Sequence, residues 1–146
     1  MGPYDPPKAI KTDVFAEMPS TYSKSGRSPG KVGARYARPQ TDVDFYLEGP
    51  AFDRDGNLYF TDVPHGRIFR MAPNGEIDLA IEYDGEPNSL KIHKDGRIFI
   101  ADYLHGIVVF DPKTGDIGPW PALRPAESFK GPNDLVFASN GDLYFT

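Results

Sequence analysis

The sequence of 146 residues contains no cysteine. Without thiols the chain can form neither a disulfide nor a thiolate metal site, and nothing supports an oxidising compartment. The sequence also has no apolar run of about twenty residues and no apolar core near its N-terminus, so neither a membrane span nor a secretory signal is predicted. Together these absences predict a cytoplasmic protein that does not act at a membrane.

Long amphipathic helices are also lacking. Between residues 45 and 146 no apolar run with a 3.6-residue period is long enough to predict a helix. The chain has 15 glycines and 15 prolines, and 13% of its residues are aromatic, a composition that a helical bundle would not tolerate. The composition therefore indicates an all-β protein with many turns.

Charge is unevenly distributed along the chain. Residues 1–40 carry seven Lys and Arg against three Asp and Glu, about +4, whereas residues 41–146 carry nine against eighteen, about −9. Nucleic acid requires a basic face, which this acidic body lacks, so no nucleic-acid partner is predicted. An acidic body is compatible with binding a cation.

An oxygen-bearing side chain stands eight positions before each of three regularly spaced glycines. The pairs are Glu48 and Gly56, Asn88 and Gly96, and Asn133 and Gly141. The glycines are separated by 40 and then 45 residues, a spacing in the range of four-stranded propeller blades. If the repeats surround an axis, the three oxygen-bearing side chains converge on it.

Strand patterns agree with this repeat. Asp-Gly turns, which favour hairpins, precede strands predicted at Leu58–Thr61 and Ile98–Ile100, where aromatic and β-branched residues are frequent. A third strand follows in each repeat, and weaker fourth strands are predicted near Ile77–Tyr83 and Ile117–Leu123. The predicted fold is therefore an all-β propeller of up-and-down four-stranded sheets, of which this chain covers about two and a half.

The N-terminal segment has a different composition. Residues 1–44 form a basic arm rich in Pro, Gly and Ser, and residues 45–146 form blades 1 to 3, with the third blade truncated. The arm is either a basic tether or a strand-bearing segment that completes the last blade of the propeller. We favour the second role, for Ile10–Phe15 or for Val43–Leu47.

Two motifs resemble a known family. Glu48-Gly-Pro-Ala-Phe followed by Asp-Gly-Asn-Leu-Tyr-Phe-Thr-Asp, and Gly131-Pro-Asn-Asp-Leu followed by Asn-Gly-Asp-Leu-Tyr-Phe-Thr, are similar to the senescence marker protein, gluconolactonase and luciferin-regenerating enzyme family. The resemblance covers about residues 45–146 and the N-terminal half of the family pattern. It implies a six-bladed propeller with one divalent cation, most commonly calcium, on its axis, and hydrolysis of sugar lactones or other cyclic esters.

The resemblance also implies roles for the three repeated side chains. Glu48 would be a charged metal ligand, and Asn133 a metal ligand or a substrate contact, whereas Asn88 has a less typical motif and would only contact substrate. The cation would polarise a lactone carbonyl and lower the pKa of a bound water. The alternatives are structural: Glu48 would cap backbone amides at the channel mouth, and Asn133 would bond its own turn.

Hydrolysis also needs a base, for which the chain offers three candidates. Asp134 follows Asn133 and would either orient that amide or accept a proton. His65 and His105 each precede a glycine in the turn at the same end of their blades as Glu48. Either histidine could approach a substrate, but their equivalence in the repeat favours a structural role.

The last residue, Thr146, falls in the second strand of the third repeat. We therefore expect a fragment of a longer protein, or a half-propeller whose open strand edge pairs with another chain. Alone it would have part of a metal site and little activity. Two functions remain: a metal-dependent hydrolase acting on a small lactone, and a non-catalytic propeller that serves as a ligand-binding or protein-interaction scaffold, since a fold does not settle chemistry.

Overall fold

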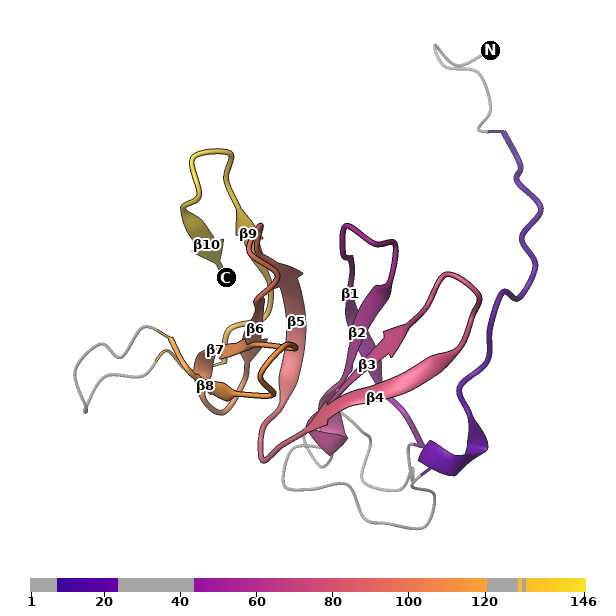
Figure 1. Ribbon diagram of the computed structural model, residues 1–146, viewed down its shortest axis with the longest axis horizontal. Helices are drawn as coiled ribbons and strands as arrows, with labels where there is room; N and C mark the ends of the chain where they lie inside the picture. Colours follow the sequence, from indigo (N-terminus) through magenta and orange to yellow (C-terminus); the bar gives the residue numbers. More distant parts are fainter. Residues whose placement is uncertain (1–7, 24–43, 121–128, 130) are drawn as a thin grey trace, which may run out of the picture.

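The computed structural model describes residues 8–23, 44–120, 129 and 131–146 (Figure 1). Its strands form antiparallel sheets with strictly sequential neighbours. The first sheet contains β1 (Leu47–Phe52), β2 (Leu58–Asp62), β3 (Arg67–Met71) and β4 (Ile77–Glu82). The second contains β5 (Pro87–Ile92), β6 (Ile98–Asp102), β7 (Gly106–Phe110) and β8 (Ile117–Pro119), and β9 (Leu135–Phe137) pairs with β10 (Leu143–Phe145).

The repeat predicted from the sequence is therefore present in the fold. Each four-stranded sheet is an up-and-down meander, the arrangement of a propeller blade, and the β9–β10 hairpin begins a third. The Asp-Gly turns close hairpins as expected: the Gly56 N–H donates to the Asp53 carbonyl at 3.3 Å, and the Gly96 N–H to the His93 carbonyl at 2.9 Å. The all-β prediction is confirmed.

Strand β6 shows how alternating side chains build the core. Ile98 and Ile100 pack into a cluster shared with the first sheet, which includes Tyr59 and Ile68. The intervening residues of β6, together with Leu135, belong to a second cluster shared with the β9–β10 hairpin. Because successive side chains point to opposite faces of a strand, a continuous apolar run such as β6 is buried on both sides. The second sheet is thus packed between the first sheet and the hairpin.

The described part of the N-terminal arm lies against the first sheet. A short 3-10 helix, η1 (Ser20–Tyr22), brings the Tyr22 ring to 5.1 Å from the Phe69 ring in an edge-to-face contact. The Tyr22 hydroxyl accepts a hydrogen bond from the Leu79 N–H at 3.3 Å, so the arm also meets β4. The arm is anchored to the blade through this tyrosine.

Parts of the predicted strand pattern differ or fall outside the described residues. Residues 10–15 belong to no strand, and Leu47 opens β1. The last blade, which the arm was expected to complete, is not part of the structure, so that role stays a prediction. Residue 43, and residues 121–123 of the predicted fourth strand of the second blade, lie outside the described residues. None of the helical turns in the described segments approaches the length and apolar character of a membrane-crossing helix.

Candidate functional site

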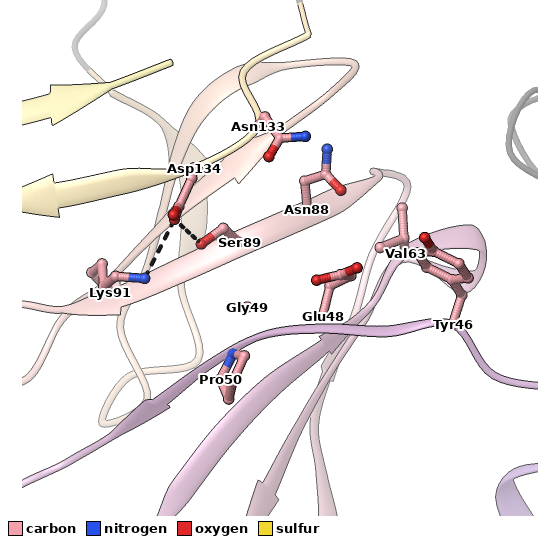
Figure 2. Close-up of a pocket in the computed structure, with 10 residues that line it drawn as sticks. All are labelled: Tyr46, Glu48, Gly49, Pro50, Val63, Asn88, Ser89, Lys91, Asn133 and Asp134. Carbon is pink, nitrogen blue, oxygen red and sulfur yellow. Dashed lines mark hydrogen bonds and ion pairs between the residues drawn. The ribbon is translucent and has the colours of Figure 1, made fainter. Parts of the chain in front are cut away.

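The three repeated oxygen-bearing side chains line one pocket of about 310 Å³ (Figure 2). Glu48 comes from β1, Asn88 from β5, and Asn133 from the segment that leads into β9. The full lining is Tyr46, Glu48, Gly49, Pro50, Val63, Asn88, Ser89, Lys91, Asn133 and Asp134. The convergence predicted from the repeat spacing is therefore observed within the described part of the chain.

Local irregularities of the strands accompany two of these side chains. The register of β1 against β2 shifts between Glu48 and Ala51, and the register of β5 against β6 shifts between Pro87 and Ser89, which leaves Asn88 without a paired residue. A bulge re-aims the side chains next to it and ends regular pairing, and such bulges are frequent beside active sites. Both blades use this device at the same end of their first strand.

Gly49 allows the first strands of the two blades to approach closely. Its φ of +54° lies in the left-handed region, and a Cβ atom added there would stand 2.5 Å from the Ser89 Cα and 2.9 Å from the Leu90 nitrogen. Any larger residue would have to push β1 away from β5. The pocket between Glu48 and Asn88 depends on this contact.

A buried aspartate fixes the backbone just before Glu48. Asp62, at the end of β2, is 0% exposed, and its Oδ1 accepts a 2.8 Å hydrogen bond from the Tyr46 N–H. The Tyr46 carbonyl in turn accepts a 3.0 Å hydrogen bond from the Val63 N–H. The residue two positions before Glu48 is thus held on both sides.

The second blade repeats this arrangement. Asp102 is also 0% exposed, and its Oδ2 accepts hydrogen bonds from the Glu86 N–H at 2.8 Å and from the Tyr83 hydroxyl at 2.7 Å. The Glu86 carbonyl accepts a bond from the Tyr103 N–H at 2.9 Å. Burial and the neighbouring Asp102 charge raise the pKa of Tyr83 far above its ordinary value, so the phenol stays a donor. Glu86 stands two positions before Asn88, as Tyr46 stands before Glu48.

Asp134 is the best-connected acidic group of the pocket. Its Oδ1 accepts hydrogen bonds from the Ser89 hydroxyl at 2.6 Å, the Leu135 N–H at 2.8 Å and the Lys91 ammonium at 3.4 Å (Figure 2). The Ser89 bond, with smaller contributions from Leu135 and Lys91, holds the pKa of Asp134 below its ordinary value even though partial burial opposes this. The group is therefore a carboxylate at neutral pH.

The amide side chains of Asn88 and Asn133 point toward one another across the pocket, and the Glu48 carboxylate extends from β1 toward the same space (Figure 2). Asn133 is exposed, and its backbone N–H donates to the Thr146 carbonyl at 2.8 Å. The Asp134 N–H donates to the Thr146 hydroxyl at 3.2 Å, and the Asp134 carbonyl accepts a hydrogen bond from the Thr146 N–H at 3.0 Å. The third repeat thus fixes the backbone of Asn133 and Asp134 through Thr146, the residue after β10.

Neither candidate histidine lines this pocket. His65 is half-buried in η2 (Val63–His65). His105 is exposed, its Nε2 lies 2.5 Å from the Asp84 carbonyl oxygen, and its backbone N–H donates to Asp102 at 2.8 Å. The structure therefore brings together Glu48, Asn88, Asn133 and Asp134 but not the histidines, and a catalytic role for His65 or His105 stays a prediction.

The oxygen donors of the pocket can be compared with what a cation needs. Within the described residues no three His, Cys, Asp or Glu side chains gather into a metal-binding group. The pocket instead offers the Glu48 carboxylate and the amide carbonyls of Asn88 and Asn133. These are hard oxygen donors of the kind calcium takes, and they number three where calcium takes six to eight. The donor set fits part of a calcium site in its chemistry.

Ser89, Lys91 and Tyr46 line the pocket but were not predicted from the sequence. A signal for Ser89 existed, because it holds the same repeat position as Asp134, one residue after the oxygen-bearing side chain. Comparing the residues that follow Asn88 and Asn133 would have indicated that Ser89 and Asp134 hold equivalent places in neighbouring blades. Lys91 and Tyr46 have no equivalent of like chemistry in the other repeats.

Consecutive four-stranded meanders with a pocket at one end of their first strands define part of a β-propeller. Residues 47–146 match the family described as the SMP-30/Gluconolactonase/LRE-like region, and the chain belongs to that family. The propeller fold and the family predicted from the sequence are both confirmed.

Among relatives, the lactonase drp35 of Staphylococcus aureus strain USA300 is 33% identical over 105 residues, covering 68% of this chain and 32% of the relative. The lactonase drp35 of Staphylococcus epidermidis is 33% identical over 114 residues, covering 73% of this chain and 34% of the relative. The chain thus spans about a third of the length of these relatives.

Solved structures share the fold. A gluconolactonase from Xanthomonas campestris superposes with a TM-score of 0.62 at 20% identity, over 69% of this chain and 34% of that one. Virginiamycin B lyase from Staphylococcus aureus superposes with a TM-score of 0.55 at 24% identity, over 73% of this chain and 36% of that one. At these identities the likeness concerns the fold alone.

Proposed function

We propose that the protein hydrolyses lactones or related cyclic esters, with a divalent cation held in the pocket that Glu48, Asn88 and Asn133 line; the donor chemistry favours calcium. One observation carries this proposal: three side chains that share one repeat position, all oxygen-bearing, line the same pocket. The family and its lactonase relatives support the reaction class.

Glu48 and Asn133 are the metal ligands in this proposal. A carboxylate and an amide carbonyl supply hard oxygens without gathering the negative charge of an all-carboxylate cage. We assign the remaining ligands to water, to substrate and to the two thirds of the relatives' length that this chain does not span. When bound, the cation would polarise the lactone carbonyl and lower the pKa of a water molecule.

Asn88 is a substrate contact in this proposal, and Asn133 shares that role. Amide groups both donate and accept hydrogen bonds, which suits the ring oxygen and hydroxyl groups of a sugar lactone. Lys91 brings the only ammonium group among the residues that line the pocket, against the carboxylates of Glu48 and Asp134. A neutral or weakly anionic lactone would suit this balance of charge.

Asp134 is the base that we favour among the three candidates, because it lines the pocket and the histidines do not. In the reaction, the oxygen of water attacks the lactone carbonyl carbon, and the ring C–O bond then breaks. The Asp134 carboxylate accepts the proton from the water and returns it to the alkoxide that leaves, which yields a hydroxy acid. The lowered pKa of Asp134 keeps its side chain ionised at neutral pH, so its oxygens are free of a proton, but it also makes the carboxylate a weaker base.

The test is a panel of sugar and aliphatic lactones offered to the full-length protein, with hydrolysis followed by acid release. We expect turnover that a chelator abolishes and added calcium restores. Turnover that survives chelation would disprove the metal dependence. Absence of turnover with every lactone and cation, together with measurable ligand binding, would instead favour a non-catalytic scaffold.

A further inference from the structure

Arg67 is a buried arginine that joins three segments of the chain. It opens β3 and is only 1% exposed. Its Nε and Nη2 donate to Oδ2 of Asp62, the aspartate that ends β2, and its Nη1 donates at 2.7 Å to the backbone carbonyl of Tyr22 in the N-terminal arm. Its guanidinium also lies 5.4 Å from the centroid of the Phe45 ring, just before β1. A buried guanidinium must have such partners, because an unpaired buried charge is strongly unfavourable.

The hydrogen bonds of Arg67 connect it, through Asp62, to the pocket. The Asp62 oxygen that Arg67 does not bind, Oδ1, accepts the N–H of Tyr46, which lines the pocket two residues before Glu48. A continuous series of polar contacts therefore runs from the Tyr22 carbonyl through Arg67 and Asp62 to the backbone that precedes Glu48. The arm is therefore linked to the site indirectly, through Arg67 and Asp62.

In the second blade the buried aspartate has a different side-chain partner. Asp102 matches Asp62 in the repeat, but the residue that matches Arg67 is Ile107. Besides the Glu86 N–H, Oδ2 of Asp102 accepts the hydroxyl of Tyr83, from the connection that leads in from the first blade. The described residues before β1, 8–23 and 44–46, belong to no sheet, and the arm with Arg67 supplies the equivalent contact.

The arm is well placed to hold its carbonyl still. The Tyr22 ring packs edge to face on Phe69 at 5.1 Å, and its hydroxyl accepts the Leu79 N–H at 3.3 Å. These two anchors fix the residue whose carbonyl meets Arg67. Outer contacts of this kind orient the groups that bind a ligand, although they never touch it.

We propose that η1 of the arm is a positioning element of the pocket, in which Tyr22 and Arg67 hold Tyr46 and so determine where Glu48 points. The structural part concerns only the backbone before Glu48. Its consequence for cation and substrate rests on the function proposed above. Tyr22 and Arg67 are positioning residues and touch neither ligand.

The experiment uses Tyr22→Ala in the full-length protein, with Phe15→Ala as the matched control. Phe15 is an exposed aromatic of the same arm that lies near Gly75 and is not among the hydrogen-bond or ring partners of Arg67 described above. Amide hydrogen exchange is measured at the N–H groups of Tyr46 and Val63, whose hydrogen bonds hold the backbone before Glu48. We expect exchange at both to accelerate at least about tenfold in Tyr22→Ala and to stay unchanged in Phe15→Ala.

Calcium affinity and lactone kinetics are measured on the same variants. We expect Tyr22→Ala to bind calcium about tenfold more weakly, the lower end of the effect of outer contacts. A second control, Ile98→Val, removes a methylene from the core and leaves the residues that hydrogen-bond Tyr46 unchanged. If Ile98→Val weakens calcium binding as much at an equal loss of thermal stability, the positioning role is wrong.

Unchanged exchange at Tyr46 and Val63 in Tyr22→Ala would also overturn the proposal, whether or not the protein binds calcium. If the wild type binds no cation and hydrolyses no lactone, the proposed function fails, but the exchange result still decides the structural part. Should Tyr22→Ala fail to fold, Tyr22→Phe keeps the ring and removes only the hydroxyl. Its exchange at Tyr46 must then exceed that of the wild type.

Discussion

Ser89 and Asp134, 45 residues apart in the chain, are joined by a 2.6 Å hydrogen bond from the serine hydroxyl to the carboxylate. Ser89 is buried in β5, and Asp134 stands just before β9, so the bond links the second blade to the third. It is the largest cause of the low pKa of Asp134. The proposed base is thus held by the neighbouring blade.

Replacing Ser89 with alanine should raise the pKa of Asp134 toward its ordinary value of 3.8. A pKa that is lower in the folded state than in the unfolded one stabilises the fold above the unfolded value, and this contribution is lost as the pH falls through the folded value. Ser89→Ala should therefore reduce the amount by which the free energy of unfolding at neutral pH exceeds that at acidic pH. The measurement is a carbon-13 NMR titration of the Asp134 carboxyl carbon.

Ser139→Ala is the control for this titration, since Ser139 lies in the turn between β9 and β10. It should leave the Asp134 titration where it is in the wild type. An unchanged Asp134 pKa in Ser89→Ala would show that the hydrogen bond does not hold the carboxylate.

Gly49→Ala should destabilise the protein and widen the gap between β1 and β5. The added methyl would stand 2.5 Å from the Ser89 Cα, and the left-handed φ of +54° is itself unfavourable for alanine. The two effects together should lower the free energy of unfolding by about 2 to 4 kcal/mol. The measurement is equilibrium unfolding in urea.

Gly115→Ala separates the two effects. Gly115 also has a positive φ, +81°, but a Cβ there would meet nothing within 4 Å. It should cost only about 1 to 2 kcal/mol, from the backbone conformation alone. Equal losses in the two variants would argue against a close contact between β1 and β5.

The sequence predicted much of this fold because the fold is a repeat. The turn glycines Gly56 and Gly96 and the alternating residues of β2 and β6 are local signals, and each repeat confirms the other. The convergence of Glu48, Asn88 and Asn133 followed from the same spacing, since equivalent positions of successive blades face one axis.

What the sequence did not predict depends on contacts between segments. The Ser89 bond to Asp134 requires the two blades to meet at one particular angle and separation, which no local pattern encodes. The bulge at Asn88 is visible only when β5 is paired with β6. The docking of Tyr22 on Phe69 joins the arm to a strand far along the chain, in a segment that reads as a loop.

Replacing Tyr83 with phenylalanine should make the free energy of unfolding fall less steeply as the pH rises in the alkaline range. Its pKa is raised by burial and then by Asp102, so the folded value exceeds the unfolded value near 10. The contribution of the neutral phenol is complete below pH 10 and is lost as the pH rises above it, because the unfolded chain then releases a proton that the folded one keeps.

Unfolding free energies of the wild type and Tyr83→Phe, measured in urea at about pH 8 and about pH 10.5, test this dependence. The wild type should lose up to about 1.4 kcal/mol more per pH unit above pH 10 than the variant. Tyr144→Phe, at an exposed position, should keep the steep slope of the wild type. Parallel slopes for the wild type and Tyr83→Phe would contradict a raised pKa.

The most direct test of the proposed metal-dependent lactonase is a calcium titration of the full-length protein and of Glu48→Gln, with lactone hydrolysis measured in the same samples. Glutamine keeps the size of the side chain but removes its charge. Calcium affinity should fall by more than about 100-fold, since even outer contacts are worth about 10- to 100-fold, and hydrolysis should fall in parallel. Wild-type affinity and turnover in Glu48→Gln would contradict the account.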